Sequence, residues 1–270
     1  TFRAAIQEAN ALAGSDNIYF NIPTSDTGYR DFDLPDTASS GDSLGGDDYW
    51  TIRPATVLPQ ITESVIIDGA TQTTNQLDSN TLGPEIEING VSAGNVEGID
   101  IGTAAAGSTI SSIVVNRFNG GSKSGIKIQG SATLLKSYVG TNVLGTAAAA
   151  NYQGVGILAT AVNVVIGNTT TDGNVLSGNT THGITMAIGT TPQNIVIAGN
   201  KIGLNAVGND KVPNITRGIS QGVSGIPSSL TTVTIGGDFP ESRNYFAGNG
   251  THASQSGYHS RFDTPASDTY

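Results

Sequence analysis

The chain has 270 residues, of which 36 are glycine, one is tryptophan, none is cysteine and 13% are charged. The lack of cysteine excludes disulfides and thiolate metal sites. The sequence contains no run of about 18 apolar residues, so it does not predict a membrane-spanning helix. A net charge of −10 argues against nucleic acid as a partner. The length fits one elongated domain.

An amphipathic helix is predicted at the start of the chain, where Gly14 can end it. Its apolar positions share one helical face: Ala5, Ile6, Ala9 and Leu12. A strand is predicted directly afterwards, over residues 18–22. A helix over the open end of stacked strands covers unpaired backbone groups, so residues 1–23 are predicted to cap the N-terminal end.

Residues 24–49 are predicted to form a long irregular loop. Seven aspartates crowd it: Asp26, Asp31, Asp33, Asp36, Asp42, Asp47 and Asp48. Oxygen-rich, flexible loops suit Ca²⁺, and the candidate metal ligands are Asp42, Asp47 and Asp48. The alternative is a solvated acidic loop, because neither an EF-hand spacing nor a nonapeptide calcium repeat is present. No other cofactor is expected.

Five segments that begin with glycine and alternate apolar residues recur at intervals of 27, 29, 29 and 35 residues. They begin at Gly98, Gly125, Gly154, Gly183 and Gly218. A period of this size indicates stacked repeats that bury their apolar faces against one another. Within each repeat, short β-branched runs alternate with turn residues, which is strand periodicity. The prediction is an all-β parallel β-helix over residues 50–253, followed by a polar tail over 254–270.

Asparagines are predicted to hold the turns of this stack together. Four of them end strands before a turn: Asn116, Asn179, Asn200 and Asn249. Asparagine tolerates left-handed backbone, and its amide can bond the repeat above and the repeat below. The apolar alternation further predicts that Ile166 and Ile235 point inward.

The segments TFRAAIQEAN and NIYFNIP, followed by LPQIT and by SGN, IG and AGN turns, resemble secreted bacterial right-handed parallel β-helix repeat proteins. The resemblance covers most of the chain. It implies a right-handed helix with an N-terminal cap helix, and a place outside a bacterial cell. It does not choose a function, since this architecture hosts lyases, epimerases, adhesins and structural surface proteins alike. We expect the chain to be part of a longer protein.

Basic residues gather in the middle of the repeat region, where only Asp172 and Asp210 are acidic between residues 102 and 237. The cluster consists of Arg117, Lys123, Lys127 and Lys136. A basic strip can hold a polyanionic sugar, so these four are the candidate glycan-binding residues. The alternative is a set of isolated surface bases.

The repeat region contains few residues that could act in catalysis. Glycoside hydrolysis needs two facing carboxylates, and Asp172 and Asp210 are 38 residues apart, which is not one repeat. A lyase or epimerase acting on a uronate or sulfated glycan could use Lys127, Lys136 and Arg117 as base and neutralising cation. That enzyme is the alternative hypothesis.

The leading hypothesis is an extracellular structural or adhesive module with no catalytic residues. It would contact a polysaccharide, a cell surface or copies of itself. The chain after Gly250 shows no pattern of a cap, so end-to-end self-association at the C-terminal end is also predicted.

Overall fold

The computed structural model describes residues 1–30, 48–76, 80–81, 83–223 and 231–250. These residues form a predominantly β structure with two α-helices, α1 (Phe2–Ala11) and α2 (Ala70–Gln76). Two short 3₁₀ helices cover Gly90–Ser92 and Pro240–Ser242. The strands form three sheets, and every strand pair in them is parallel except one. The predicted all-β class with parallel sheets is therefore confirmed.

The three sheets are named here by their strands. Sheet 1 has five strands: β6 (Ile99–Ile101), β9 (Ser124–Ile128), β12 (Gln153–Ile157), β15 (His182–Ile188) and β18 (Arg217–Val223). Sheet 2 has seven: β1 (Asp16–Tyr19), β4 (Val65–Asp68), β7 (Ser108–Ser111), β10 (Ala132–Leu135), β13 (Asn163–Ile166), β16 (Asn194–Ile197) and β19 (Thr232–Ile235). Sheet 3 has eight: β2 (Tyr29–Arg30), β3 (Tyr49–Ile52), β5 (Ile86–Asn89), β8 (Ile113–Asn116), β11 (Tyr138–Val139), β14 (Val175–Leu176), β17 (Lys201–Ile202) and β20 (Tyr245–Phe246).

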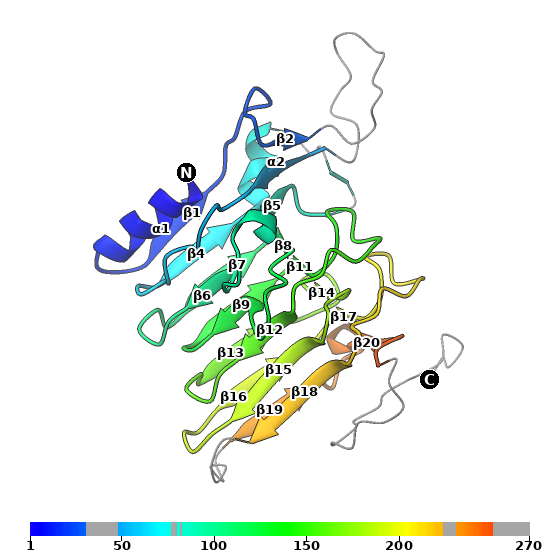
Figure 1. Ribbon diagram of the computed structural model, residues 1–270. Coiled ribbons are helices and arrows are strands. Elements are labelled where there is room, and N and C mark those ends of the chain that lie inside the picture. The colour runs from blue at the N-terminus through cyan, green and yellow to red at the C-terminus, as the bar shows by residue number, and fades with distance from the viewer. Residues whose placement is uncertain (31–47, 77–79, 82, 224–230, 251–270) are drawn as a thin grey trace.

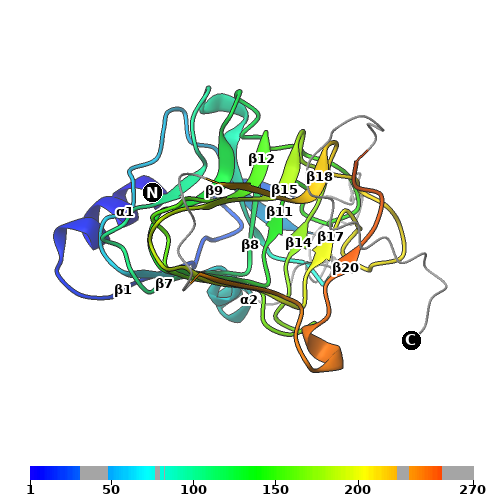
Figure 2. The ribbon, with the colours of Figure 1, turned by 90° about the horizontal axis from the view of Figure 1, so that it is seen from below.

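From β6 onward the chain visits sheets 1, 2 and 3 in the same order, and we call each such passage a coil (Figures 1 and 2). Each strand pairs with the strand of the same sheet in the next coil. The register aligns the five glycine-led repeats, because the residue after each glycine pairs with its counterpart in the next repeat. These residues are Ile99, Ile126, Val155, Ile184 and Ile219. One sequence repeat thus corresponds to one coil, which is compatible with a β-helix-like solenoid.

Columns of aliphatic side chains fill the interior. In sheet 2, Leu134, Ile166, Ile197 and Ile235 are successive partners. Ile166 is fully buried, so the prediction that it points inward is confirmed. Ile235 shares its register position but is 38% exposed, because within the described residues no strand lies on the far side of β19.

The predicted N-terminal helix is present, but it ends at Ala11, before Gly14, and Leu12 is 53% exposed and not part of its buried face. Its buried residues are Phe2, Ile6 and Ala9, and Phe2 packs against Phe20 with ring centroids 6.1 Å apart. The Arg3 guanidinium donates to the carbonyls of Thr56 and Val57 at 3.0 and 2.7 Å. The helix is therefore fastened to the loop that precedes β4.

The strand predicted over residues 18–22 is wrong at its C-terminal end, because β1 ends at Tyr19. Beyond Tyr19 the backbone forms hydrogen bonds with side chains of helix α2, which was not predicted, in place of the bonds of a longer strand. Ile22 donates its N–H to the Gln72 side chain at 2.9 Å and accepts from it at 2.8 Å, and Phe20 donates to Thr71. Gln72 is fully buried, so a polar side chain closes this corner.

Asparagine side chains form two hydrogen-bonded columns at the corners of the coils. The first column contains Asn151, Asn179, Asn214 and Asn249, with amide-to-amide distances of 3.2, 2.9 and 2.8 Å. The second contains Asn174, Asn200 and Asn244, with both distances at 2.9 Å. Each of these amides also donates to a backbone carbonyl of the preceding coil.

The four asparagines named from the sequence therefore lie in different places. Asn179 and Asn249 share the first column, and Asn200 lies in the second. Asn116 belongs to neither column, because its amide donates to Glu87 Oε1 at 2.8 Å and to the carbonyl of Thr141 at 2.9 Å.

Replacing Asn179 by alanine should destabilise the protein by about 1–3 kcal/mol, because buried polar groups in two coils lose a partner. The matched control is Asn194→Ala, since Asn194 is exposed and its loss should cost less than about 0.5 kcal/mol. Denaturant or thermal midpoints of the two variants measure the difference. Equal shifts in both variants would contradict a stabilising role of the column.

Candidate functional site

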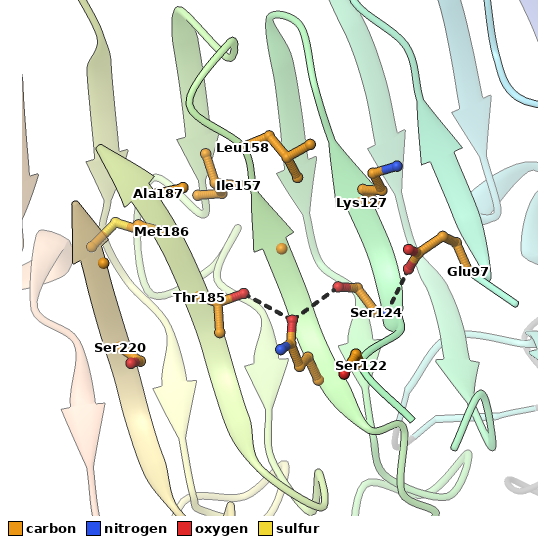
Figure 3. A pocket seen from close by; sticks show the side chains of 13 residues that line it. Glu97, Ser122, Ser124, Lys127, Ile157, Leu158, Thr185, Met186, Ala187 and Ser220 are labelled. Carbon is orange, nitrogen blue, oxygen red and sulfur yellow. Dashed lines mark hydrogen bonds between the residues drawn. The ribbon is translucent and has the colours of Figure 1, made fainter. Parts of the chain in front are cut away.

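A shallow trough crosses the outer face of sheet 1, with a volume of about 350 Å³ (Figure 3). It extends over β9, β12, β15 and β18, with Glu97 at one end. Neighbouring strands lie about 4.8 Å apart, so the trough runs roughly 14 Å across the strands. We define the trough by its outward residues: Glu97, Ser122, Ser124, Lys127, Gln153, Gly156, Leu158, Thr185, Ala187, Ser220 and Gly222.

The floor of the trough follows from the register. Lys127, Gly156, Thr185 and Ser220 are successive partners on β9, β12, β15 and β18. Each is the third residue of a glycine-led repeat, where the alternation turns the side chain away from the buried columns. Gly156 packs closely against Ser124, because a Cβ added there would lie 2.5 Å from Ser124 Oγ.

A hydrogen-bonded polar row borders one side of the floor. Gln153 joins its two neighbours, since its Oε1 accepts from Ser124 Oγ at 3.3 Å and from Thr185 Oγ1 at 3.1 Å. Figure 3 shows these bonds meeting at one side chain between Ser124 and Thr185. Because the Gln153 side-chain oxygen already accepts these two hydrogen bonds, the amide is held in one orientation. Its NH₂ group can then donate to a ligand.

The other side of the trough is apolar. Leu158 and Ala187 are half-buried and line it, and Figure 3 shows them on the opposite side of the floor from Ser124. Ile157 and Met186 also border it, although both are buried in the interior, with exposed fractions of 2% and 3%. The trough therefore offers hydroxyl and amide groups along one side and aliphatic surface along the other.

The two charged residues of the trough are both ion-paired. Lys127 Nζ lies 3.5 Å from Asp100 Oδ2 on β6. Glu97 Oε1 lies 3.7 Å from Lys123 Nζ, and its Oε2 accepts from the backbone N–H of Ser124 at 2.6 Å. This end of the trough carries little net charge.

The structure does not assemble the four predicted glycan-binding bases into one strip. Lys127 lines the trough and Lys123 pairs with Glu97 at its end. Lys136 follows β10 at a corner of sheet 2, and Arg117 follows β8 at a corner of sheet 3. Each has an acidic partner: Arg117 Nη1 lies 2.9 Å from Glu87 Oε1, and Lys136 Nζ lies 3.2 Å from Asp172 Oδ1. The cluster of positive charge in the sequence becomes four separate ion pairs.

Of the three predicted metal ligands, Asp42 and Asp47 lie outside the described residues. Asp48 is buried, and its Oδ2 accepts from the Tyr29 hydroxyl at 2.7 Å. Within the described part of the chain, no three His, Cys, Asp or Glu side chains come close enough together to hold a metal ion.

His182 is the first residue of β15 and pairs with Arg217 on β18. Neither ring nitrogen has a hydrogen-bond partner among the described residues. Burial lowers the pKa of His182 from its ordinary value of 6.5, and the positive charge of Arg217 lowers it further. Both effects favour the neutral imidazole over the charged form.

The sequence points to the trough only indirectly. Gln153, Gly156 and Thr185 lie in segments that reveal the repeat, but they occupy the outward positions of that repeat. One feature of the sequence could have indicated the trough. The third residue of the glycine-led segment is small or polar in three successive repeats: Gly156, Thr185 and Ser220.

Comparison of the chain with protein-family models, with curated proteins and with solved structures gives no match. Among the described residues, neither helix is long and apolar enough to cross a membrane. The fold and the geometry of the site therefore carry the functional argument.

The lowered pKa of His182 predicts that acid destabilises the protein. The unfolded chain takes up a proton as the pH falls below about 6.5, while the folded state resists protonation, so stability falls through that range. His182→Gln should reduce the loss of thermal stability between about pH 7 and pH 5.5, with little change at pH 8. Identical pH profiles for the two proteins would contradict this assignment.

Proposed function

We propose that the chain is a right-handed parallel β-helix that acts outside a bacterial cell as a structural or adhesive module. In this proposal the trough on sheet 1 binds an extended glycan of low charge. The observation that carries the proposal is the trough itself, with a hydrogen-bonding row on one side and an aliphatic surface on the other.

The chemistry of the trough matches that of a sugar chain. Sugars present hydroxyl groups around their rings and C–H surfaces on their faces, so they need donors, acceptors and apolar area together. The Gln153 amide and the Thr185 and Ser220 hydroxyls supply the polar partners, and Leu158 and Ala187 supply the apolar area. Among the residues that the structure describes, no aromatic side chain lines the trough, which favours modest affinity at each site.

Ion pairing favours a neutral ligand over a polyanion. An acidic glycan would have to compete with Asp100 for Lys127 and with Glu97 for Lys123. Bringing a further carboxylate against these acids also costs like-charge repulsion. The acidic glycan of the sequence hypothesis is therefore the less favoured ligand of the trough.

The lyase or epimerase alternative needs a base and a neutralising cation at one place. Lys127 lies on β9, whereas Lys136 follows β10 and Arg117 follows β8. Each of the three is paired with an acid. No geometry in the described residues favours this alternative over binding.

A bulky side chain in the trough should weaken glycan binding. Ser220→Trp is expected to weaken binding at least about tenfold, because the ring fills the floor. The matched control is Thr133→Trp, on the outer face of sheet 2. Calorimetric titration with oligosaccharides of β-1,4-glucan, β-1,3-glucan and mannan measures this, with oligogalacturonate as the charged comparison.

Three results of that experiment would contradict the proposal. They are unchanged binding by Ser220→Trp, binding of oligogalacturonate alone, and the absorbance of an unsaturated product in the oligogalacturonate mixture. The last result would restore the lyase alternative.

We also propose that the module associates with a second copy through its C-terminal coil. Within the described residues, no strand pairs with the far edges of β18, β19 and β20. Apolar side chains lie exposed there, with Ile235, Tyr245 and Phe239 at 38%, 48% and 66%. Unpaired edges with exposed apolar side chains favour pairing with another chain.

This second proposal predicts a mass that rises with protein concentration. Light scattering of the 270-residue chain should show dimers, and Ile235→Lys should reduce the dimer fraction because it adds charge to the edge. Val57→Lys is the control, since Val57 is 51% exposed and lies near α1. A constant monomer mass at millimolar concentration would contradict the proposal.

A further inference from the structure

A second cavity, of about 410 Å³, opens on the outer face of sheet 3. It is separate from the trough, because the two share no lining residue in the described part of the chain. Its wall includes strand residues and the loops that follow sheets 2 and 3. Its lining includes the polar side chains of Glu85, Lys136, Tyr138, Thr170, Thr171 and Lys201.

Tyr138, Val175 and Lys201 form the strand wall of the cavity, since they are successive partners on β11, β14 and β17. The Tyr138 ring is tightly enclosed, because a Cβ added at Gly83 would lie 2.5 Å from its Cε2 atom and one at Gly145 would lie 2.9 Å away. Burial raises the pKa of Tyr138 to about 12. The phenol is therefore neutral and adds no negative charge to the wall.

Lys201 differs from the four bases near the start of the repeats. In the part of the chain that the structure describes, no carboxylate lies within 4 Å of its ammonium. The side chain is half-buried, and its stem packs beside Gly208, where an added Cβ would lie 3.2 Å from Cε. Burial lowers the pKa of Lys201 from 10.5. A partly desolvated cation without a partner is unfavourable, and an anion would offset that cost.

Lys136 brings a second positive charge to the same cavity. Its backbone is left-handed, with φ +49°, at the corner position that Gly199 occupies two coils later with φ +74°. A lysine at a position suited to glycine carries backbone strain. Its Nζ lies 3.2 Å from Asp172 Oδ1, and Asp172 does not line the cavity.

The remaining polar groups complete a site of mixed character. Thr170 and Thr171 bring hydroxyl groups from the loop before β14, and Thr171 Oγ1 lies 2.8 Å from Thr169 Oγ1. Glu85 is buried on the opposite segment, and its Oε1 accepts from the backbone N–H of Asn80 at 3.4 Å. On the neighbouring strand, Tyr245 pairs with Lys201.

We propose that this cavity binds a small oxyanion, with the Lys201 ammonium as its principal partner and with Lys136 and the hydroxyls of Thr170 and Thr171 at its rim. The ligand chemistry is a carboxylate, phosphate or sulfate group, because these groups accept several charge-assisted hydrogen bonds at once. A single acidic sugar and a free inorganic anion both carry such a group. The proposal is independent of glycan binding in the trough.

The test compares Lys201→Met with Lys211→Met. Lys201→Met keeps an unbranched apolar stem of similar length and removes the charge, whereas Lys211 is exposed and does not line the cavity. Calorimetric titration with inorganic phosphate, sodium sulfate and D-galacturonate should show binding to the unmodified chain. Lys201→Met should weaken it at least about tenfold, and Lys211→Met should leave it unchanged.

The Lys201 ammonium gives a second readout, by NMR of its ¹³Cε resonance. A bound anion stabilises the charged form, so the pKa of Lys201 should rise when the probe is added. Binding of phosphate or sulfate alone would identify an inorganic anion or an ester of it, and binding of galacturonate alone would identify a carboxylate ligand. Either result supports the proposal. No binding of any probe, equal binding by Lys201→Met, or binding without a change in the pKa of Lys201 would overturn it.

Discussion

Parallel pairing between successive coils is the constraint on which the rest of this structure depends. Apart from the strands at the sheet edges, each strand finds its hydrogen-bond partners in the coil before and the coil after it, so every coil must keep the register of its neighbours. The corners obey the same rule, because the columns through Asn179 and Asn200 bond one coil to the next. A lost bond at a corner therefore weakens the fit of two coils together.

Because the register is fixed, the position of a residue within the repeat determines where its side chain lies on the surface. Residues at one position of the repeat line up across the strands about 4.8 Å apart, and the trough is such a column, from Lys127 through Gly156 and Thr185 to Ser220. The ion pair between Asp100 and Lys127 arises in the same way, since they are direct partners on adjacent strands. Binding surfaces on this fold need only side-chain changes at outward positions, because the backbone beneath them is set.

The period could be predicted from the sequence because one repeat is one coil, and its glycine-led segments pair in register. Helix α2 was missed because its sequence, ATQTTNQ, has no apolar stripe, and its role depends on Gln72 bonding a distant backbone segment. Membership of the asparagine columns was also hidden. Asn179 and Asn200 end similar motifs, yet they lie at two different corners of the coil. The spacing of a motif therefore predicts that it recurs once per coil, but it does not predict at which corner of the coil it lies.

The same limit explains the basic residues. Arg117 and Lys136 are 19 residues apart, which is less than one coil, so the chain carries them to different corners, each beside an acid. Charge clustering in a sequence predicts a charged surface only when the spacing equals a whole coil. Lys201 lies away from the cluster in sequence, and no feature of its local pattern distinguishes it. Only the structure shows that Lys201 shares a cavity with Lys136. The burial of Lys201 and its lack of an acidic partner within the described residues depend on how the coils stack, so the sequence does not reveal them.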